Sequence, residues 1–242
     1  MQTNARQALR VLDKGLAIAL HGESGSGKSV TARALIGLSG PNATVKADLF
    51  EIDGLSVLDY RDKEWRGLRG NKIGFVLQDA LVSLDPLRRI SQQLSDAFGV
   101  KGFFRRPDVT DRSKALLRSV GIPDPDRRLL QYPHQLSGGL RQRALIATAV
   151  ARSPSLLIAD EPTTALDATV QKQILDLLAE RRRAGHTLLL ISHDLAVVSR
   201  LADRVLVMHN GRIVEEGPTR QILNAPKEAY TRHLLEAVPS AG

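Results

Sequence analysis

The stretch Gly22-Glu23-Ser24-Gly25-Ser26-Gly27-Lys28-Ser29 decides the fold of this chain. An apolar run at 16–20 predicts a buried strand before it, and residues 28–38 after it have the pattern of a helix. Glycines between a strand and a helix let backbone N–H groups close around phosphate oxygens at the helix N-terminus. The order predicts a nucleotide phosphate loop that consists of Gly22, Glu23, Ser24, Gly25, Ser26, Gly27, Lys28 and Ser29.

Two side chains of this loop have the chemistry that a nucleoside triphosphate requires. The ammonium of Lys28 can neutralise the β and γ phosphates, and the hydroxyl of Ser29 is suited to Mg²⁺. We therefore expect ATP and Mg²⁺ as cofactors. A glycine-rich turn without a ligand is the alternative, and the flanking strand and helix argue against it.

Further apolar runs predict more strands at 45–52, 73–77, 156–159, 188–191 and 205–208. Most of them are continuously apolar, as expected for parallel strands that are buried on both faces. The chain is therefore predicted to have an α/β core. Because ligands of such sheets bind at the carboxyl ends of the strands, polar residues directly after these runs are candidates for the site.

Three of these strands end at such polar residues. Asp160 can hold Mg²⁺ directly or through a bound water, and Glu161 can orient or deprotonate a water that attacks the γ-phosphate. The imidazole of His193 can reach the γ-phosphate and the attacking water. The amide of Gln78 can touch both Mg²⁺ and water. The candidate catalytic residues are Glu161, His193 and Gln78, and the candidate metal ligands are Ser29, Gln78 and Asp160.

A different pattern occupies residues 88–152, where helices are predicted at 90–98, 112–120 and 140–151 and no strand is convincing. We expect a helical subdomain inserted in the core. The predicted domains are an ATP-binding core at 1–87 and 153–220, a helical subdomain at 88–152, and a tail at 221–242 with a terminal helix at 227–237.

A second anion-binding turn is predicted at Leu136-Ser137-Gly138-Gly139. Ser137 is a typical helix-cap residue, and the two glycines expose N–H groups at the start of the next helix. A helix cap without catalytic importance is the ordinary interpretation of such a turn. Since the turn has no magnesium ligand of its own, an ATP molecule that touches it would belong to another subunit.

Composition limits the function classes. Among 242 residues there is no cysteine, which excludes disulfides and thiolate metal sites, and the formal net charge of +8 fits nucleic acid, anionic lipid or phosphate ligands. Aromatic residues make up only 4%, too few for base-stacking platforms, so no nucleic-acid partner is expected. We expect a soluble or peripheral protein, because no apolar window reaches the roughly 18 residues of a membrane span. No chemistry is assigned to His21, His134, His186, His209 and His233, which lack metal-ligand spacing.

Taken together and in this order, the motifs resemble those of the ATP-binding cassette (ABC) family over about residues 11–235. The resemblance implies a RecA-like P-loop NTPase core with an inserted helical subdomain. It also implies a dimer in which each ATP lies between one subunit's phosphate loop and the other's signature turn. The implied counterparts are Walker A at 22–29, the Q-loop at Gln78, the signature at 137–142, Walker B at Asp160, the catalytic carboxylate Glu161, the switch histidine His193 and the interface loop at Asp167. The nucleotide-binding set thereby gains Ser137, Gly138, Gly139, Gln142 and Asp167.

Shorter sequence segments are similar to those of the ATPases of peptide and nickel importers. They include Ser83-Leu84-Asp85-Pro86, Tyr132-Pro133-His134-Gln135 and, in the tail, Tyr230-Thr231, although Glu228-Ala229 departs from the usual His-Pro. The resemblance implies an ATP-hydrolysing importer subunit for peptides or for nickel or another metal chelate. It would lie at the cytoplasmic face of the inner membrane of a bacterial or archaeal cell. Its implied partners are a second ABC ATPase subunit in a hetero- or homodimer, integral-membrane permeases and, indirectly, an extracytoplasmic solute-binding protein.

Two other functions stay open, and one expected residue is absent. A soluble ABC-type ATPase that acts on nucleic acid, the ribosome or an enzyme complex is supported only by the +8 charge. A P-loop kinase would have no use for Ser137-Gly138-Gly139. The resemblance also implies two strands and an adenine-stacking aromatic before the phosphate loop, but residues 1–21 contain no Phe, Tyr or Trp. We expect either a shortened front or another group over the base.

Overall fold

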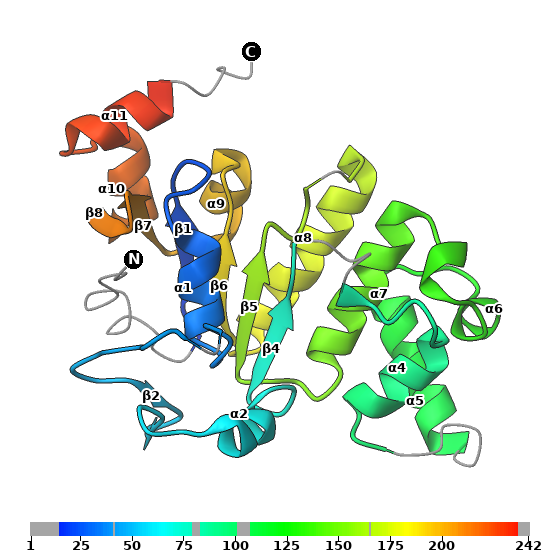
Figure 1. Ribbon diagram of the computed structural model, residues 1–242. Coiled ribbons are helices and arrows are strands. Elements are labelled where there is room, and N and C mark those ends of the chain that lie inside the picture. The colour runs from blue at the N-terminus through cyan, green and yellow to red at the C-terminus, as the bar shows by residue number, and fades with distance from the viewer. Residues whose placement is uncertain (1–14, 41, 79–82, 101–106, 165, 237–242) are drawn as a thin grey trace. The chain divides into compact units, whose positions relative to one another are not determined.

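The structure is a computed structural model that describes residues 15–40, 42–78, 83–100, 107–164 and 166–236 (Figure 1). Its contacts divide the chain into two compact units. The first unit comprises Met1–Leu68 and Thr187–Gly242, and the second unit comprises Arg69–His186. The domain boundaries expected from the sequence stay a prediction.

The first unit is built on four strands in the order β6-β1-β7-β8. Strand β1 (Ala17–His21) pairs in parallel with β6 (Thr187–Ile191) and β7 (Arg204–His209), so that the Cα of Ala19 lies opposite those of Leu190 and Val205. Every residue of β1 and β6 is buried. The strands expected at 16–20, 188–191 and 205–208 are confirmed, because continuously apolar segments are stable where both faces of a sheet are covered.

A hairpin joins β7 to the antiparallel strand β8 (Arg212–Pro218), which the sequence analysis missed. The turn residues Asn210 and Gly211 have φ of 47° and 76°, as a two-residue turn between twisted strands requires. The strand was missed because its apolar residues are few. Asn-Gly between two extended segments is the local signal that predicts such a hairpin.

Three short helices complete this part of the first unit: α9 (Leu195–Leu201), α10 (Thr219–Asn224) and α11 (Ala229–Glu236). Figure 1 shows α10 and α11, in orange and red, after β8. Buried side chains of β1, α9, β7 and α10 form one apolar cluster, against which Tyr230 and Leu234 of α11 pack. The terminal helix expected at 227–237 is therefore confirmed as α11, with Ala237 outside the described residues.

The remaining elements of the first unit are α1 (Lys28–Ala34), the two-residue strands β2 (Glu51–Ile52) and β3 (Leu55–Ser56), and α2 (Asp62–Leu68). The helix expected at 28–38 is real but shorter, and Gly37 follows it with a φ of 68° under the ring of Trp65. The strand expected at 45–52 is mostly wrong. Only β2 forms, paired with β3, and Val45 stays exposed because no strand covers it.

The second unit contains two parallel strands and a group of helices. Strand β4 (Ile73–Val76) pairs with β5 (Leu156–Asp160), and Ile73 lies opposite Leu156. The helices are α4 (Ile90–Ala97), α5 (Pro107–Ser119), α6 (Pro125–Leu129), the 3₁₀ turn η3 (Pro133–Gln135), α7 (Gly138–Val150) and α8 (Ala168–Arg183). A Cβ on Gly74 would lie 2.4 Å from the carbonyl oxygen of Ala149, so glycine allows α7 to approach β4 closely.

These elements confirm the expected strands at 73–77 and 156–159 and the expected helices at 90–98, 112–120 and 140–151. The described residues between 88 and 152 contain no strand, in agreement with the sequence analysis. Parallel strands alternating with helices confirm the α/β class. Within the described part of the chain, no helix is both long enough and apolar enough to cross a membrane.

One buried carboxylate fixes the start of the C-terminal helix. Glu215 of β8 is buried, and its Oε1 accepts the backbone N–H of Lys227 at 2.8 Å while its Oε2 accepts that of Glu228 at 3.2 Å. Burial raises the pKa of Glu215, but hydrogen bonding by Lys227, Thr231 and Glu228, together with the charge of Arg232, leaves this pKa below its ordinary value of 4.5. The charged carboxylate therefore stabilises the docked position of α11.

This arrangement predicts acid-sensitive stability. A pKa that is lower in the folded than in the unfolded protein contributes stability that is present above the ordinary value and disappears as the pH falls through the folded value. Glu215→Gln should lower the free energy of unfolding by about 1–2 kcal/mol at pH 7, and this difference from wild type should shrink below pH 4.5. Urea unfolding of both proteins at a series of pH values measures the difference in the free energy of unfolding.

The matched control is Glu216→Gln, whose exposed carboxylate pairs with Arg204 at 3.2 Å. This variant should change the free energy of unfolding by less than about 1 kcal/mol. A Glu215→Gln difference that stayed constant from pH 7 to pH 3 would contradict the role given to the carboxylate.

Candidate functional site

The phosphate loop lies between the end of β1 at His21 and the start of α1 at Lys28. Gly25 and Gly27 have φ of 81° and 102°, in the left-handed region that glycine adopts without a steric cost. Gly27 is the residue before the first turn of α1. This backbone presents N–H groups at a helix N-terminus, as expected for a phosphate-binding loop.

The β7–β8 hairpin supports this loop from behind. A Cβ on Gly22 would lie 2.2 Å from the carbonyl oxygen of Met208, and one on Gly27 would lie 3.3 Å from the Cε of the same methionine. The backbone N–H of Gly211 donates to the carbonyl oxygen of Ser26 at 2.9 Å. The first glycine of the motif is therefore required by the contact of the loop with β7.

Lys28 folds back into its own loop. Its Nζ donates to the carbonyl oxygens of Gly22 and Glu23 at 2.7 and 2.6 Å, and to Oγ of Ser26 at 3.3 Å. The side chain is buried, and Ser29 lies half-buried in the first turn of α1. The ammonium is thus held inside the loop, where the phosphates of a bound nucleotide would meet it.

The first unit also places His193 near this loop, because β6 is the direct neighbour of β1. His193 is exposed and follows β6, while Asp194 begins α9 by accepting the N–H of Ala196 at 2.8 Å. His21 is different: it is buried, and its Nδ1 lies 2.8 Å from the carbonyl oxygen of Ser192. This contact confirms a packing role for His21.

The end of β5 carries the two predicted carboxylates of the second unit. Asp160 is the last residue of the strand and is only 2% exposed. Glu161 has a φ of 49°, which costs a residue with a Cβ about 1 kcal/mol. The hydroxyl of Thr164 donates to Oε2 of Glu161 at 3.1 Å. Asp53, Asp124, Ser153 and Asn210 have a similar φ, so this conformation alone does not mark a functional residue. The sequence analysis did not single out Thr164.

The signature turn begins α7. Ser137 is the N-cap, and its Oγ accepts the N–H of Leu140 at 3.4 Å, which confirms the predicted cap. Gly138 is exposed, and a Cβ on it would meet no atom of the described residues within 4 Å. A Cβ on Gly139 would lie 3.6 Å from Val170, an ordinary contact. Packing in this part of the chain therefore does not require glycine at 138.

Two other predicted nucleotide-binding residues, Gln142 and Asp167, make contacts within the second unit. Gln142 is buried, and its Nε2 donates to the carbonyl oxygen of Pro162 at 3.2 Å, which joins α7 to the segment after Glu161. Asp167 is the N-cap of α8, and its Oδ1 accepts the N–H of Val170 at 2.9 Å. Their assignment as nucleotide ligands stays a prediction.

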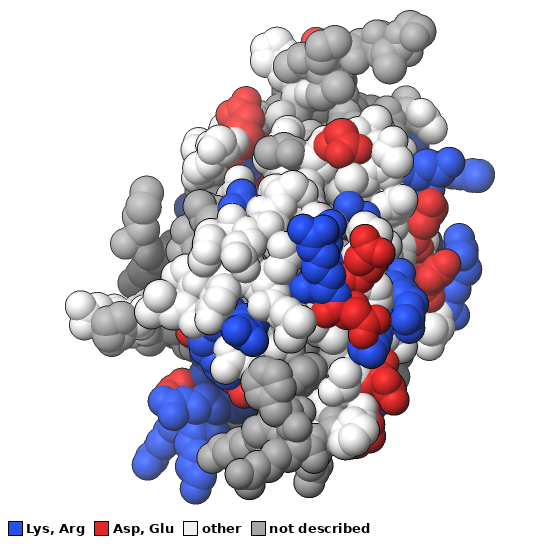
Figure 2. All heavy atoms as spheres, turned by 90° about the vertical axis from the view of Figure 1, so that its right-hand side faces the viewer, with Lys and Arg blue, Asp and Glu red and all other residues white. Residues whose placement is uncertain are grey.

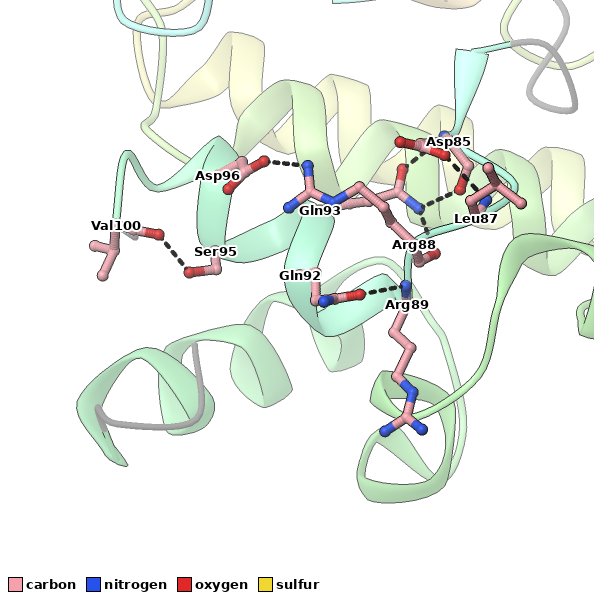
Figure 3. A network of polar contacts seen from close by, with 9 residues as sticks. All are labelled: Asp85, Leu87, Arg88, Arg89, Gln92, Gln93, Ser95, Asp96 and Val100. Carbon is pink, nitrogen blue, oxygen red and sulfur yellow. Dashed lines mark hydrogen bonds and ion pairs between the residues drawn. The ribbon is translucent and has the colours of Figure 1, made fainter. Parts of the chain in front are cut away.

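Gln78 is exposed and follows β4, whose partner strand β5 ends at Asp160. Residues 79–82 lie outside the described residues, and the turn after them is fixed by a polar network (Figure 3). Oε1 of Gln93 accepts the N–H of Asp85 at 3.0 Å, and its Nε2 donates at 3.0 Å to the carbonyl oxygens of Asp85 and Arg88. Leu87 donates its N–H to Oδ1 of Asp85 at 2.9 Å.

The same turn presents an apolar side chain to solvent. Leu87 is 85% exposed, although its backbone is fixed by the network. Arg88 forms an ion pair with Asp96, and this hydrogen-bonded contact raises the pKa of the guanidinium. The turn therefore combines a hydrogen-bonded backbone with an exposed apolar side chain.

The structure thus groups the predicted residues within each unit. The first unit brings the phosphate loop and His193 onto neighbouring strands. The second unit brings Gln78, Asp160 and Glu161 to the ends of β4 and β5, with the signature helix joined to the latter through Gln142. Among the residues that the structure describes, no group of three His, Cys, Asp or Glu side chains could hold a metal ion by itself.

Comparisons with known proteins agree with this geometry. The family model described as ABC transporter matches residues 10–164. The chain is 44% identical over 232 residues to the dipeptide transport ATP-binding protein DppD of Lactococcus lactis subsp. cremoris strain MG1363. It is also 44% identical over 231 residues to the oligopeptide transport ATP-binding protein OppD of Lactococcus lactis subsp. cremoris strain SK11. These matches cover 95% of this chain and 66% and 68% of the two relatives.

A solved structure gives the same result for the fold. The dimeric ATP-binding cassette MJ0796, in a post-hydrolysis state bound to ADP and Pi, matches with a TM-score of 0.74 and 28% identity. The match covers 86% of this chain and 88% of that protein. The likeness shows the predicted P-loop NTPase fold with an inserted helical subdomain. By its sequence and its fold, this chain belongs to the ABC transporter family.

Proposed function

We propose that the chain is the ATP-hydrolysing subunit of an ABC importer for peptides. The observation that carries the proposal is Glu161, held in a strained backbone conformation directly after the buried Asp160. The names of the two Lactococcus relatives support peptides as the solute. Nickel or another metal chelate stays a prediction, as does a position at the cytoplasmic face of the inner membrane.

The phosphate loop would bind the triphosphate. Its backbone N–H groups and the ammonium of Lys28 would take the β- and γ-phosphate oxygens. A hydroxyl at Ser29, a carboxylate at Asp160 and an amide oxygen at Gln78 are the hard oxygen donors that Mg²⁺ prefers, so the residues present fit this ion. When bound, Mg²⁺ would neutralise charge on the phosphates.

Glu161 would orient the attacking water and take its proton. The hydrogen bond from Thr164 fixes one oxygen of the carboxylate. His193, exposed after β6, would donate to the γ-phosphate as negative charge develops there. These roles rest on positions at the ends of strands, where rigid backbone keeps catalytic groups in place.

A second cassette would complete each ATP site. The open space at Gly138 and the N–H groups at the start of α7 suit an anion that another subunit holds. The matched cassette MJ0796 is dimeric. Permeases would bind the fixed turn at Leu87, which follows Gln78 along the chain, and a solute-binding protein would act through them.

A nucleic-acid function is not favoured. On the face drawn in Figure 2, acidic and basic side chains are interspersed around a broad uncharged area, apart from a group of basic side chains at its lower edge. A protein that follows a phosphate backbone gathers basic side chains into a stripe or a large patch. The +8 charge therefore does not indicate a nucleic-acid site on this face.

Removing the carboxylate of Glu161 tests the catalytic assignment. Glu161→Gln should keep ATP binding, because the amide has nearly the same shape, but should lower the turnover number by roughly 10²–10⁴-fold. Equilibrium ATP binding and phosphate release measure the two effects. The exposed Glu180 of α8 provides the control, since Glu180→Gln should hydrolyse ATP at the wild-type rate. Near-normal hydrolysis by Glu161→Gln would remove the residue from this role.

Shortening the exposed leucine tests the permease contact. Leu87→Ser should weaken binding to membranes that contain the permease by about 10–100-fold. This is the effect expected when a leucine that the permease would bury is lost. ATP hydrolysis by the isolated chain should not change. Co-sedimentation with those membranes measures binding, and Leu55→Ser, on the β2–β3 hairpin, is the matched exposed control. Equal membrane binding by both variants would contradict the assignment.

A further inference from the structure

The C-terminal helix α11 reaches the phosphate loop through one side chain. The backbone N–H of Glu23, the second residue of the loop, donates to Oη of Tyr230 at 3.4 Å. The ring of Tyr230 lies against that of His209, with the ring centroids 3.9 Å apart. His209 is the last residue of β7, which also backs the loop through Met208. The helix and the hairpin therefore meet at the loop.

Several contacts fix α11 in this position. Glu215 of β8 accepts the N–H groups of Lys227 and Glu228 just before the helix. Arg232 donates from Nη1 to the carbonyl oxygens of Pro226 and Lys227 at 3.1 and 2.8 Å. Tyr230 itself packs against the apolar cluster of β1 and β7. These contacts restrict the position of α11, and therefore the position of the Tyr230 hydroxyl at its surface.

Glu23, the residue that Tyr230 contacts, also makes hydrogen bonds inside the loop. The carbonyl oxygen of Glu23 accepts Nζ of Lys28 at 2.6 Å and the N–H of Ser26 at 3.2 Å. The two sides of Glu23 are therefore engaged, the N–H by Tyr230 and the carbonyl by Lys28. A shift of this residue would move the ammonium and the N–H groups that meet the phosphates, so its support affects phosphate binding.

We propose that Tyr230 is a positioning residue for the phosphate loop and that α11 is a working part of the nucleotide site. The inference rests on the proposed ATPase function but goes beyond it, since it assigns a role to a residue 207 positions away from the loop. Tyr230 would act through the loop backbone, by accepting the N–H of Glu23. Its effect is on the binding of phosphates, not on the chemical step.

Tyr230→Phe tests the hydroxyl while keeping the ring on His209. The dissociation constants of ATP and ADP should each rise about 2- to 5-fold, as expected for the loss of one hydrogen bond. The turnover number at saturating ATP should stay within about twofold of wild type, because the groups that act on the water are unchanged. The melting temperature should stay at the wild-type value. Tyr60→Phe removes a hydroxyl from a ring that packs on Trp65 in the same unit and should bind both nucleotides normally.

The outcomes separate this inference from the proposed function. Failure of the wild-type chain to bind ATP, or of the assembled ATPase to hydrolyse it, would remove the proposed function. A wild-type chain that hydrolyses ATP, with a Tyr230→Phe variant that binds ATP and ADP equally well, would overturn only the positioning role. A lowered melting temperature with unchanged nucleotide binding would also overturn it, since Tyr230 would then serve stability alone.

A double-mutant cycle tests whether α11 acts through Tyr230. Glu215→Gln loosens the docking of α11 and should weaken ATP binding about 2- to 5-fold in the wild-type background. In the Tyr230→Phe background, the same change should have a smaller effect, because the contact with the loop is already lost. Fully additive effects on the dissociation constant would contradict the proposed path from helix to loop.

Discussion

The phosphate loop folds around the ammonium of Lys28, and the path of the loop depends on the strand behind it. Two carbonyl oxygens of the loop accept this cation, and without it they would repel phosphate oxygens. The loop can follow this path only if Gly22 lacks a Cβ, because the backbone of β7 lies directly behind it. The buried strand β1 and the β7–β8 hairpin thus help to position the side chain of Lys28.

Three places where local rules are broken coincide with the proposed functions. Glu161 adopts a left-handed backbone conformation, Gly138 starts a helix without a packing reason, and Leu87 exposes an apolar side chain from a rigid turn. Such conflicts between local preference and fold are expected at functional sites. We propose that here they serve catalysis, a second subunit and a permease.

The sequence was sufficient to predict the strands that consist of a continuous apolar run. The strands at 73–77, 156–159, 188–191 and 205–208 were found because burial on both faces leaves an unmistakable apolar run. The expectation at 45–52 failed because extended apolar residues form a strand only where a partner covers them. Strand β8 was missed because its alternating pattern includes the buried Glu215.

The site was predictable to the same extent and for a similar reason. Motif residues such as Lys28, Asp160 and Glu161 lie at fixed positions after strands, so that their chemistry can be read from local order. The contact between Glu23 and Tyr230 joins residues 207 positions apart and depends on how α11 docks. The strain at Glu161 is a backbone property that no residue type reveals. The assignment of individual residues to ATP and Mg²⁺ stays a prediction.

We propose that the signature turn serves an ATP molecule held by another subunit. Gly138→Asp tests it most directly, since aspartate suits a helix N-terminus and fits the open space, yet repels a phosphate. ATP affinity of the dilute, isolated chain should equal that of wild type, while turnover by the assembled ATPase should fall on the order of 10²-fold. A loss of ATP affinity in the isolated chain, as large as the loss of turnover, would place the turn in the chain's own site and contradict the account.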